Sequence, residues 1–347
     1  MRIAIVADAP NFNVRSWTKG LVDAGAAVDI ISFEDDPDAC CPVHRLDAPA
    51  VFGAKARYLL AGPSVRRTVA ELRPDLVIGY YVTGYGSSAR LARHPVTVQV
   101  AIGNDVLVNP PGTLTRRFAR RNLAEARLVV AWSAQIADGV RTFGVEKERI
   151  LTLMGGIDLA PYGEQDPGGD PLRLVTSRAL DPYYQHEVLI DSLAALDPLP
   201  FELTFIGSGP IRSELEGRVA TRGVADRVTF AGRVSEDEKV GILYRQGVYV
   251  SACPTDGVSA SLLESMAVGL FPIVVDDVAN RDWIETGVNG LLYDGSVSGL
   301  TTALREVNAR PELLSTARTA NRRLVAERAD RRRNSTIFLS EFARLVG

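Results

Sequence analysis

Short runs of β-branched and aliphatic residues alternate with helical patterns along the whole chain, and this alternation restricts the folds that it can adopt. In the first half, strand candidates lie at residues 3–7, 28–32, 76–80, 97–101 and 128–132. A second series lies at residues 172–176, 202–206, 228–231, 249–252 and 272–275. Helical patterns, such as those at residues 17–24 and 114–126, separate several of these strands. Strands that alternate with helices indicate βαβ units and parallel sheets.

The two series are separated by residues 157–171, which are rich in Gly, Pro and Asp, a composition typical of a linker. A chain of 347 residues is also longer than a single hydrophobic core usually reaches. We therefore predict two doubly wound α/β domains, over residues 1–156 and 172–330, joined by a hinge and binding a ligand between them. Residues 331–347 have the pattern of a final helix, which we expect to pack back on the first domain.

Composition excludes several classes of protein. A net charge of −3 and a pI near 5.8 argue against a nucleic-acid-binding protein, which needs a basic face. The three cysteines and three histidines lack the spacing of a metal site. No apolar run approaches the ~18–20 residues that span a bilayer, and the first strand soon reaches Asp8, unlike a signal peptide. We expect a cytoplasmic protein of GC-rich bacterial origin, because arginine far outnumbers lysine, and peripheral membrane contact stays open.

The most informative motif is the segment PTDGVSASLLESMAVGLFP at residues 254–272. It predicts a strand end, a turn and an apolar helix, whose first backbone N–H groups suit a phosphate. Asp256 and Glu264 can flank the same ligand and hold its hydroxyls. In the alternative interpretation, Asp256 only caps the helix and Glu264 lies on its solvated face.

This segment resembles the signature of the family 4 retaining glycosyltransferases, which use nucleotide sugars. Asp256 stands where that family has Glu, one methylene longer. Further matches follow in the family's order across both halves, and they are PDLVIGYY at 74–81, AIGNDV at 101–106, GVEKERI at 144–150, GGID at 155–158, FIGSGP at 205–210, VTFAGRV at 228–234 and GVNGLL at 287–292. The resemblance implies a GT-B fold, in which two Rossmann-like domains face each other across a hinge.

The resemblance also implies roles for residues of the second domain. Glu264 would accept both ribose hydroxyls of the nucleotide, Asp256 would hold a hydroxyl of the sugar, and Arg178 would bind the diphosphate. A plain surface arginine at a strand end is the alternative for Arg178. The other donor contacts that the resemblance implies are Gly207, Gly209, Val234, Gly257, Val258, Ser259, Ala260 and Ser261.

Several positions depart from the family's pattern. Tyr184 stands where a diphosphate-binding lysine is usual, and a phenol donates a hydrogen bond without neutralising charge. The chain has only four lysines, so the local sequence supplies no second cation, and Arg212 or another arginine is the candidate to reach the site. The family's first-domain histidine is also missing. The candidates for contact with the acceptor in the first domain are therefore Asn13, Tyr80, Tyr85 and Asp105. A helix cap for Asn13 and a core position for Tyr80 are equally good interpretations.

The resemblance implies transfer of a sugar from a nucleoside diphosphate sugar, with UDP favoured, to the hydroxyl of an unidentified acceptor. It implies retention at the anomeric carbon and no requirement for a metal or cofactor. The GSG at residues 207–209 follows a strand, but the third glycine of a dinucleotide fingerprint is replaced by Arg212. Two alternatives stay open, namely a nucleotide-sugar epimerase or phosphorylase on the same scaffold, and a non-catalytic sugar-nucleotide binder.

Overall fold

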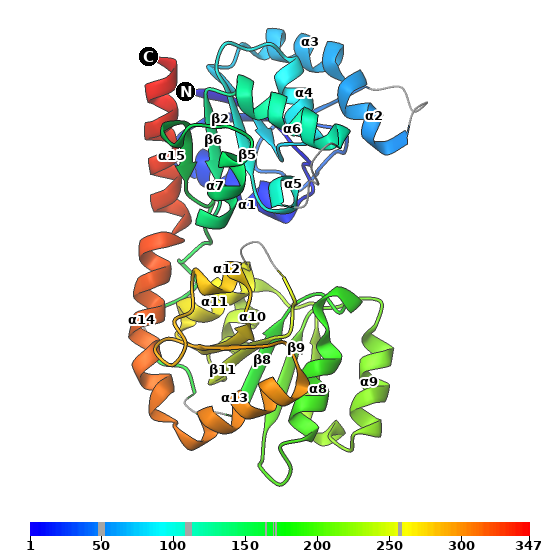
Figure 1. The fold of residues 1–347 in the computed structure, drawn as a ribbon, viewed down its shortest axis with the longest axis vertical. Helices are drawn as coiled ribbons and strands as arrows, with labels where there is room; N and C mark the ends of the chain where they lie inside the picture. Colours follow the sequence, from blue (N-terminus) through cyan, green and yellow to red (C-terminus); the bar gives the residue numbers. More distant parts are fainter. Residues whose placement is uncertain (48–52, 108–112, 164, 169, 171, 256–258) are drawn as a thin grey trace. The chain divides into compact units, whose positions relative to one another are not determined.

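The computed structural model describes residues 1–347 except for 48–52, 108–112, 164, 169, 171 and 256–258 (Figure 1). The chain divides into two compact units. Unit 1 consists of Met1–Gly156 together with Arg328–Gly347, and unit 2 consists of Ile157–Glu327. Each unit contains a parallel β-sheet flanked by helices, which confirms the predicted α/β class with doubly wound sheets.

In the described part of unit 1, the strands form one parallel sheet in the order β3-β2-β1-β4-β5-β6-β7. The strand order reverses between β1 and β4, which pair directly. From β1 the chain continues to β2 and β3 at one edge of the sheet, and from β4 it continues through β5 and β6 to β7 at the other edge. The strands are β1 (Arg2–Val6), β2 (Ala27–Ser32), β3 (Val43–Arg45), β4 (Leu76–Tyr80), β5 (Thr97–Ala101), β6 (Leu128–Ala131) and β7 (Ile150–Thr152).

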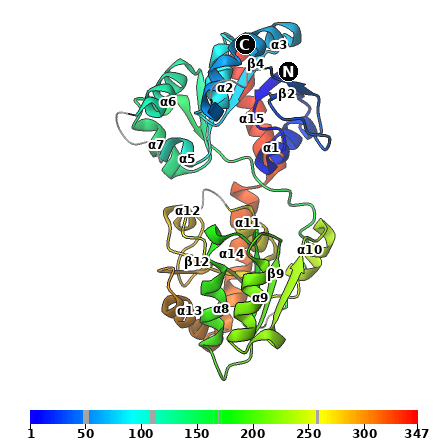
Figure 2. The same ribbon diagram turned by 90° about the vertical axis from the view of Figure 1, so that its right-hand side faces the viewer.

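The helices of unit 1 come from both ends of the chain. The last one, α15, lies along α1, as Figures 1 and 2 both show. Its Phe338 packs edge-on against Trp17 of α1 with ring centroids 5.3 Å apart, and both side chains are fully buried. The helices of unit 1 are α1 (Phe12–Asp23), α2 (Gly53–Leu60), α3 (Gly62–Leu72), α4 (Tyr85–Leu91), α5 (Asn104–Leu107), α6 (Leu114–Glu125), α7 (Ala134–Arg141) and α15 (Arg331–Val346).

Unit 2 repeats this plan with the strand order β10-β9-β8-β11-β12-β13, which reverses between β8 and β11. Its strands are β8 (Arg173–Ser177), β9 (Glu202–Ile206), β10 (Val228–Gly232), β11 (Val248–Ser251), β12 (Phe271–Val275) and β13 (Leu291–Tyr293). Its helices are α8 (His186–Ala194), α9 (Arg212–Thr221), α10 (Glu236–Leu243), α11 (Ala260–Val268), α12 (Val278–Arg281), α13 (Val297–Ala309) and α14 (Glu312–Arg328).

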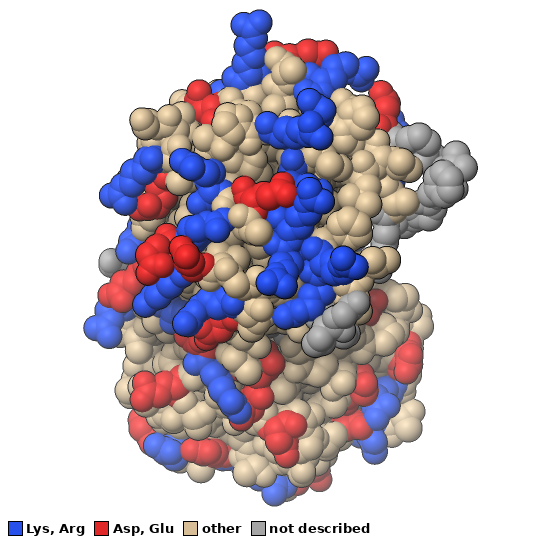
Figure 3. Space-filling view, turned by 45° about the horizontal axis from the view of Figure 1, so that its top comes forward, with Lys and Arg blue, Asp and Glu red and all other residues tan. Residues whose placement is uncertain are grey.

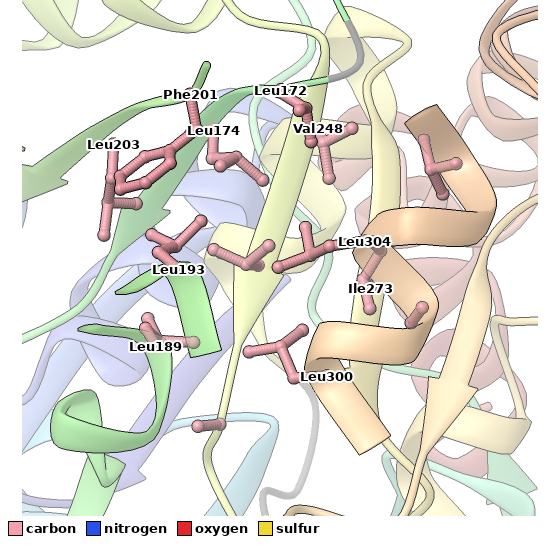
Figure 4. Packing of buried hydrophobic residues seen from close by; sticks show 14 of the residues in the cluster. Leu172, Leu174, Leu189, Leu193, Phe201, Leu203, Val248, Ile273, Leu300 and Leu304 are labelled. Atoms are coloured by element: carbon pink, nitrogen blue, oxygen red, sulfur yellow. The ribbon is translucent and has the colours of Figure 1, made fainter. Parts of the chain in front are cut away.

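Aliphatic side chains fill the space between the sheet and helices of unit 2. Figure 4 shows Leu174 and Val248 of the central strands packed with Leu193 of α8 and Leu304 of α13. These side chains are 0–1% exposed. Burial on both faces explains why β12 is a continuous apolar run rather than an alternating one. The packed core therefore holds the ends of β8 and β11 in fixed positions.

Charge is distributed unevenly between the units. Unit 1 contains 24 lysines and arginines against 17 acidic residues, whereas unit 2 contains 15 against 25. The basic side chains gather over the upper part of the view in Figure 3, which belongs to unit 1. Unit 2 is thus net acidic, and an anionic ligand there would depend on local positive groups rather than on the overall field.

Candidate functional site

Four loops of unit 2 meet at the carboxyl edge of its sheet. They follow β8, β9, β10 and β11, and β8 and β11 are the neighbours at which the strand order reverses. In open α/β sheets, ligands bind at this reversal, outside the carboxyl ends of the strands. Most of the residues that we predicted for the second domain lie on these loops.

The loops after β8 and β9 are in direct backbone contact. The Arg178 N–H donates to the Ile206 carbonyl at 3.0 Å. Gly207 has a φ of +140°, and a Cβ atom there would lie 2.1 Å from the Arg178 carbonyl oxygen. At Gly209 it would lie 2.2 Å from the Leu180 carbonyl oxygen. Both positions therefore require glycine, and the close contact that they permit fixes the backbone that carries Arg178.

The Arg178 side chain reaches the start of α11. Its guanidinium donates to Ser259 Oγ, and the guanidinium carbon lies 5.2 Å from the centroid of the Tyr184 ring. Tyr184 thus contacts Arg178 through its ring face, a cation–π arrangement that helps to orient the guanidinium. The prediction from the sequence for Tyr184 concerned its hydroxyl group, whereas this contact uses the ring.

Helix α11 begins with a serine cap. Ser259 Oγ accepts from the Leu262 N–H at 3.1 Å, and the Ser261 hydroxyl lies 2.9 Å from the Tyr249 hydroxyl. The N–H groups of Ala260 and Ser261 are in the first turn, where a helix offers them no internal acceptor. The guanidinium of Arg178 and the positive end of α11 therefore converge on one place. Asp256, Gly257 and Val258 lie outside the described residues.

Glu264 faces a lysine from a neighbouring helix. Lys239 Nζ of α10 lies 3.0 Å from Glu264 Oε1 and 2.9 Å from Glu236 Oε2. The Tyr162 hydroxyl donates to the other oxygen of Glu236 at 3.2 Å. The side chains of Glu264 and Lys239 are only 11% and 15% exposed. The alternative interpretation, in which Glu264 lies on a solvated face of the helix, is therefore wrong. The residue that caps α11 is Ser259.

The charges of this cluster influence one another strongly. Burial raises the pKa of the Glu264 carboxyl, while Lys239 and, more weakly, Arg178 oppose that rise. Burial lowers the pKa of Lys239, but the two adjoining carboxylates outweigh burial and raise it overall. Lys239 is therefore a stable cation, and it is the main group that favours an ionised Glu264.

Lys239 is the functional candidate that sequence reasoning missed. The sequence near Arg178 supplies no second cation and leaves an arginine such as Arg212 as the candidate, whereas Lys239 lies 61 positions after Arg178. The sequence does contain one indication of this lysine's position, the SEDEK run at residues 235–239. Its capping box starts α10 and thereby determines which face of the helix carries Lys239. Arg212, by contrast, pairs with Glu216 at 2.8 Å on the surface of α9.

Val234 lies between β10 and the cap of α10 and is half-buried. Its neighbour Arg233 donates from Nε to Ser208 Oγ at 3.0 Å, and the Gly207 N–H donates to the Gly232 carbonyl at 2.8 Å. These bonds join the loop after β10 to the glycine loop after β9. Val234 therefore belongs to the same edge of unit 2 as Arg178.

Unit 1 has a cavity of about 820 Å³ at the carboxyl ends of β1 and β4. Its lining combines the Asp8 carboxylate and several hydroxyl groups with large apolar side chains. Burial raises the pKa of Asp8, and Glu34 adds to that rise. The lining residues are Asp8, Asn11, Ala56, Arg57, Tyr58, Leu59, Tyr81, Thr83, Gly84, Tyr85, Ser87, Leu114, Thr115 and Phe118.

The structure separates the aromatic candidates of unit 1. Tyr85 lines the cavity, beside Tyr58 and Phe33. Tyr80 is fully buried between Trp17 and Trp132 and therefore lies in the core. The prediction that Tyr80 contacts an acceptor is wrong. Its neighbour Tyr81 lines the cavity instead, with a φ of 71° that is unusual for a residue other than glycine. Both faces of β4 are buried, and only the residue that follows the strand can turn outward.

Asp105 and Asn13 are not among the residues that line the cavity. The buried carboxylate of Asp105 accepts from the N–H groups of Val82 at 2.8 Å and Gly103 at 3.0 Å. Burial raises the pKa of Asp105 to about 6, although these bonds favour its ionised form. The prediction that Asp105 contacts the acceptor is therefore wrong. Asp105 instead joins the loops after β4 and β5. The Asn13 N–H donates to the Oδ1 atom of the helix cap Asn11 at 2.9 Å.

No group of three or more His, Cys, Asp or Glu side chains in the described ranges is arranged to hold a metal ion. Within the part of the chain that the structure describes, no helix is both long enough and apolar enough to cross a membrane.

Comparisons with known proteins agree with this geometry. Residues 10–156 match the model of the glycosyl transferase 4-like domain, and residues 171–309 match the model of the glycosyl transferases group 1. The 2-deoxystreptamine glucosyltransferase of Streptomyces kanamyceticus is 23% identical over 290 residues, which cover 75% of this chain and 73% of that protein.

Solved structures share the fold over the whole length. A sucrose-phosphate synthase from Thermosynechococcus elongatus superposes with a TM-score of 0.81 at 18% identity, covering 99% of both chains. Anabaena HepE in complex with UDP superposes with a TM-score of 0.79 at 17% identity, covering 99% of this chain and 100% of that one. The predicted GT-B fold is confirmed. With a glycosyl transferase 4-like domain followed by a glycosyl transferases group 1 domain, the chain belongs to the glycosyltransferases.

Proposed function

We propose that this glycosyltransferase is a retaining enzyme that transfers a sugar from a nucleoside diphosphate sugar to a hydroxyl acceptor without a metal ion. The observation that carries the proposal is the convergence of Arg178 and the start of α11 at one edge of unit 2, beside the ion-paired Glu264. UDP is the favoured nucleotide, because related structures of Anabaena HepE were solved with UDP and with UDP-glucose.

The donor would lie along this edge, with its negatively charged diphosphate beside the positive groups of unit 2. The diphosphate would accept from Arg178 and from the first N–H groups of α11, and the ribose hydroxyls would donate to Glu264. Because unit 2 is net acidic, these local groups must supply the positive potential. Asp256, which the structure does not describe, keeps its proposed contact with a hydroxyl of the sugar.

In the proposed reaction, the bond between the anomeric carbon and the β-phosphate oxygen breaks while the acceptor oxygen bonds to the same face of that carbon. The acceptor proton passes to the leaving phosphate oxygen, so the products are a glycoside and a nucleoside diphosphate. Negative charge develops on the leaving diphosphate in the transition state. Arg178 and the α11 amides would stabilise that charge, the role of preorganised positive groups in such reactions.

We place the acceptor in the cavity of unit 1. Its Asp8, Thr83 and Ser87 offer hydrogen-bonding groups to a hydroxylated ring, and Leu59 and Phe118 supply apolar surface. Both of these apolar side chains are more than a third exposed. This lining favours an acceptor that carries an apolar or aromatic part beside its reactive hydroxyl.

The donor half is tested by melting the protein in the presence of nucleoside diphosphates and their sugars. A ligand at a hundred times its Kd adds about 2.7 kcal/mol of stability. We expect UDP and one UDP-sugar to raise the Tm of the wild type, and Arg178→Ala and Glu264→Gln to abolish the rise. Arg212→Ala is the matched control, because Arg212 pairs with Glu216 on the surface. A folded wild type that no nucleotide stabilises would contradict the proposal.

Catalysis is tested with the stabilising UDP-sugar and a panel of glycosides that carry aromatic aglycones. A product with the donor's anomeric configuration by NMR, formed equally well in EDTA, is the expected result. An epimerised donor in the absence of acceptor would favour the epimerase instead. Binding without turnover on any acceptor would favour the non-catalytic binder.

A further inference from the structure

We propose that Lys239 is a positioning residue for recognition of the nucleotide's ribose, because it holds one oxygen of Glu264 and leaves the other for the ribose hydroxyls. The inference rests on the proposed function, in which Glu264 accepts those hydroxyls. Lys239 Nζ bonds to Glu264 Oε1 at 3.0 Å. Glu264 Oε2 accepts no hydrogen bond from the described residues.

The start of α10 and a neighbouring carboxylate fix the position of Lys239. Ser235 and Glu238 form a capping box that starts α10, with bonds of 2.8 and 3.3 Å between side chain and backbone. Glu236, one turn before Lys239 on this helix, bonds to the ammonium at 2.9 Å. Tyr162 holds the second oxygen of Glu236. A chain of polar contacts therefore runs from Tyr162 through Glu236 and Lys239 to Glu264.

Charge as well as geometry depends on this contact. Glu264 is buried, and a buried carboxylate with no cation beside it tends to take up a proton. A protonated carboxyl accepts hydrogen bonds from hydroxyls more weakly than a carboxylate does. Lys239 lies in direct contact with Glu264 and therefore keeps it in the form that the ribose requires. Arg178, whose guanidinium donates to Ser259, favours the ionised form of Glu264 more weakly.

A purely structural ion pair is the competing explanation, and ribose chemistry distinguishes the two. If Lys239 acts on the ribose through Glu264, its removal should matter only for nucleotides that carry ribose hydroxyls. If Lys239 only supports the packing of α10 on α11, its removal should weaken the binding of every nucleotide to the same extent.

The experiment measures the Kd of UDP and of 2′,3′-dideoxyuridine diphosphate by calorimetry for the wild type and Lys239→Met. We expect Lys239→Met to weaken UDP binding about tenfold or more, the equivalent of one charge-assisted hydrogen bond, and to weaken binding of the dideoxy nucleotide less than about twofold. Lys239→Arg should restore UDP binding. Lys147→Met, which removes an exposed lysine of unit 1, is the control.

A pH series supplies a second readout. The affinity of the wild type for UDP should fall as pH falls through the pKa of Glu264, and in Lys239→Met the fall should begin at a higher pH. Should Lys239→Met fail to fold, Lys239→Gln keeps a donor to Glu264 without the charge and should show the same shift in pH. Equal loss of both nucleotides, or an unchanged pH profile, would overturn the inference while leaving the donor site in place. A wild type that binds UDP and the dideoxy nucleotide equally would instead remove the ribose role of Glu264, and no binding at all would remove the proposed function.

Discussion

Replacing Phe338 by alanine should destabilise unit 1 strongly, although the residue lies at the far end of the sequence. Its side chain is fully buried between Trp17, 5.3 Å away between ring centroids, and Phe342, 5.9 Å away. Phe→Ala in a core costs about 3–5 kcal/mol, because apolar contact is lost and a cavity remains. For a unit of this size, such a loss lowers the Tm by roughly 6–20 °C.

The assay is urea unfolding followed by tryptophan fluorescence, since Trp17 and Trp132 report on unit 1. Phe12→Ala is the matched control, because it makes the same chemical change in the same unit at a side chain that is 64% exposed. We expect the free energy of unfolding to change by less than about 0.5 kcal/mol in that control. A Phe338→Ala protein as stable as the Phe12→Ala protein would refute the packing of α15 on α1.

Two further predictions concern unit 2. Gly207→Ala should lower the free energy of unfolding by more than ~2 kcal/mol and weaken UDP binding, because its Cβ would overlap the Arg178 carbonyl. Gly217→Ala, on the open surface of α9, should raise that free energy by ~0.5–1 kcal/mol, and equal urea midpoints for the two variants would refute the steric argument. The bond from Arg218 lowers the pKa of Asp191 against the effect of burial. Asp191→Asn should therefore cost ~1–2 kcal/mol at pH 7. That difference is complete above the ordinary pKa of 3.8 and is lost as pH falls through the lower folded-state pKa, so a constant difference in urea unfolding between pH 7 and 3 would contradict the assignment.

The strands of four or more residues could be predicted from the sequence, but the three-residue strands could not. The predicted strands at residues 76–80, 97–101 and 202–206 coincide with β4, β5 and β9. These strands are mostly buried, so aliphatic and aromatic residues recur along them and make their limits clear. The three-residue strands β3, β7 and β13 were not predicted, because so short a run has no measurable period. Helix α1 begins at Phe12, five residues before the predicted stretch, because Asn11 caps it.

The candidate site could be predicted where function depends on the backbone, and less well where it depends on contacts between distant residues. Gly207 and Gly209 stand out in the sequence, because only glycine fits so close to another chain segment. The contact between Lys239 and Glu264 depends instead on how α10 packs beside α11, which no local pattern records. Tyr80 and Tyr81 are adjacent in the sequence, and only the burial of β4 shows which of them can reach the cavity.

The most direct test of the account is a crystal structure of the protein with UDP. We predict the diphosphate within hydrogen-bonding distance of Arg178 and of the first N–H groups of α11. The ribose hydroxyls should bond to Glu264, with Lys239 still in contact with its other oxygen. A nucleotide bound elsewhere on the protein, or a ribose turned away from Glu264, would contradict the account.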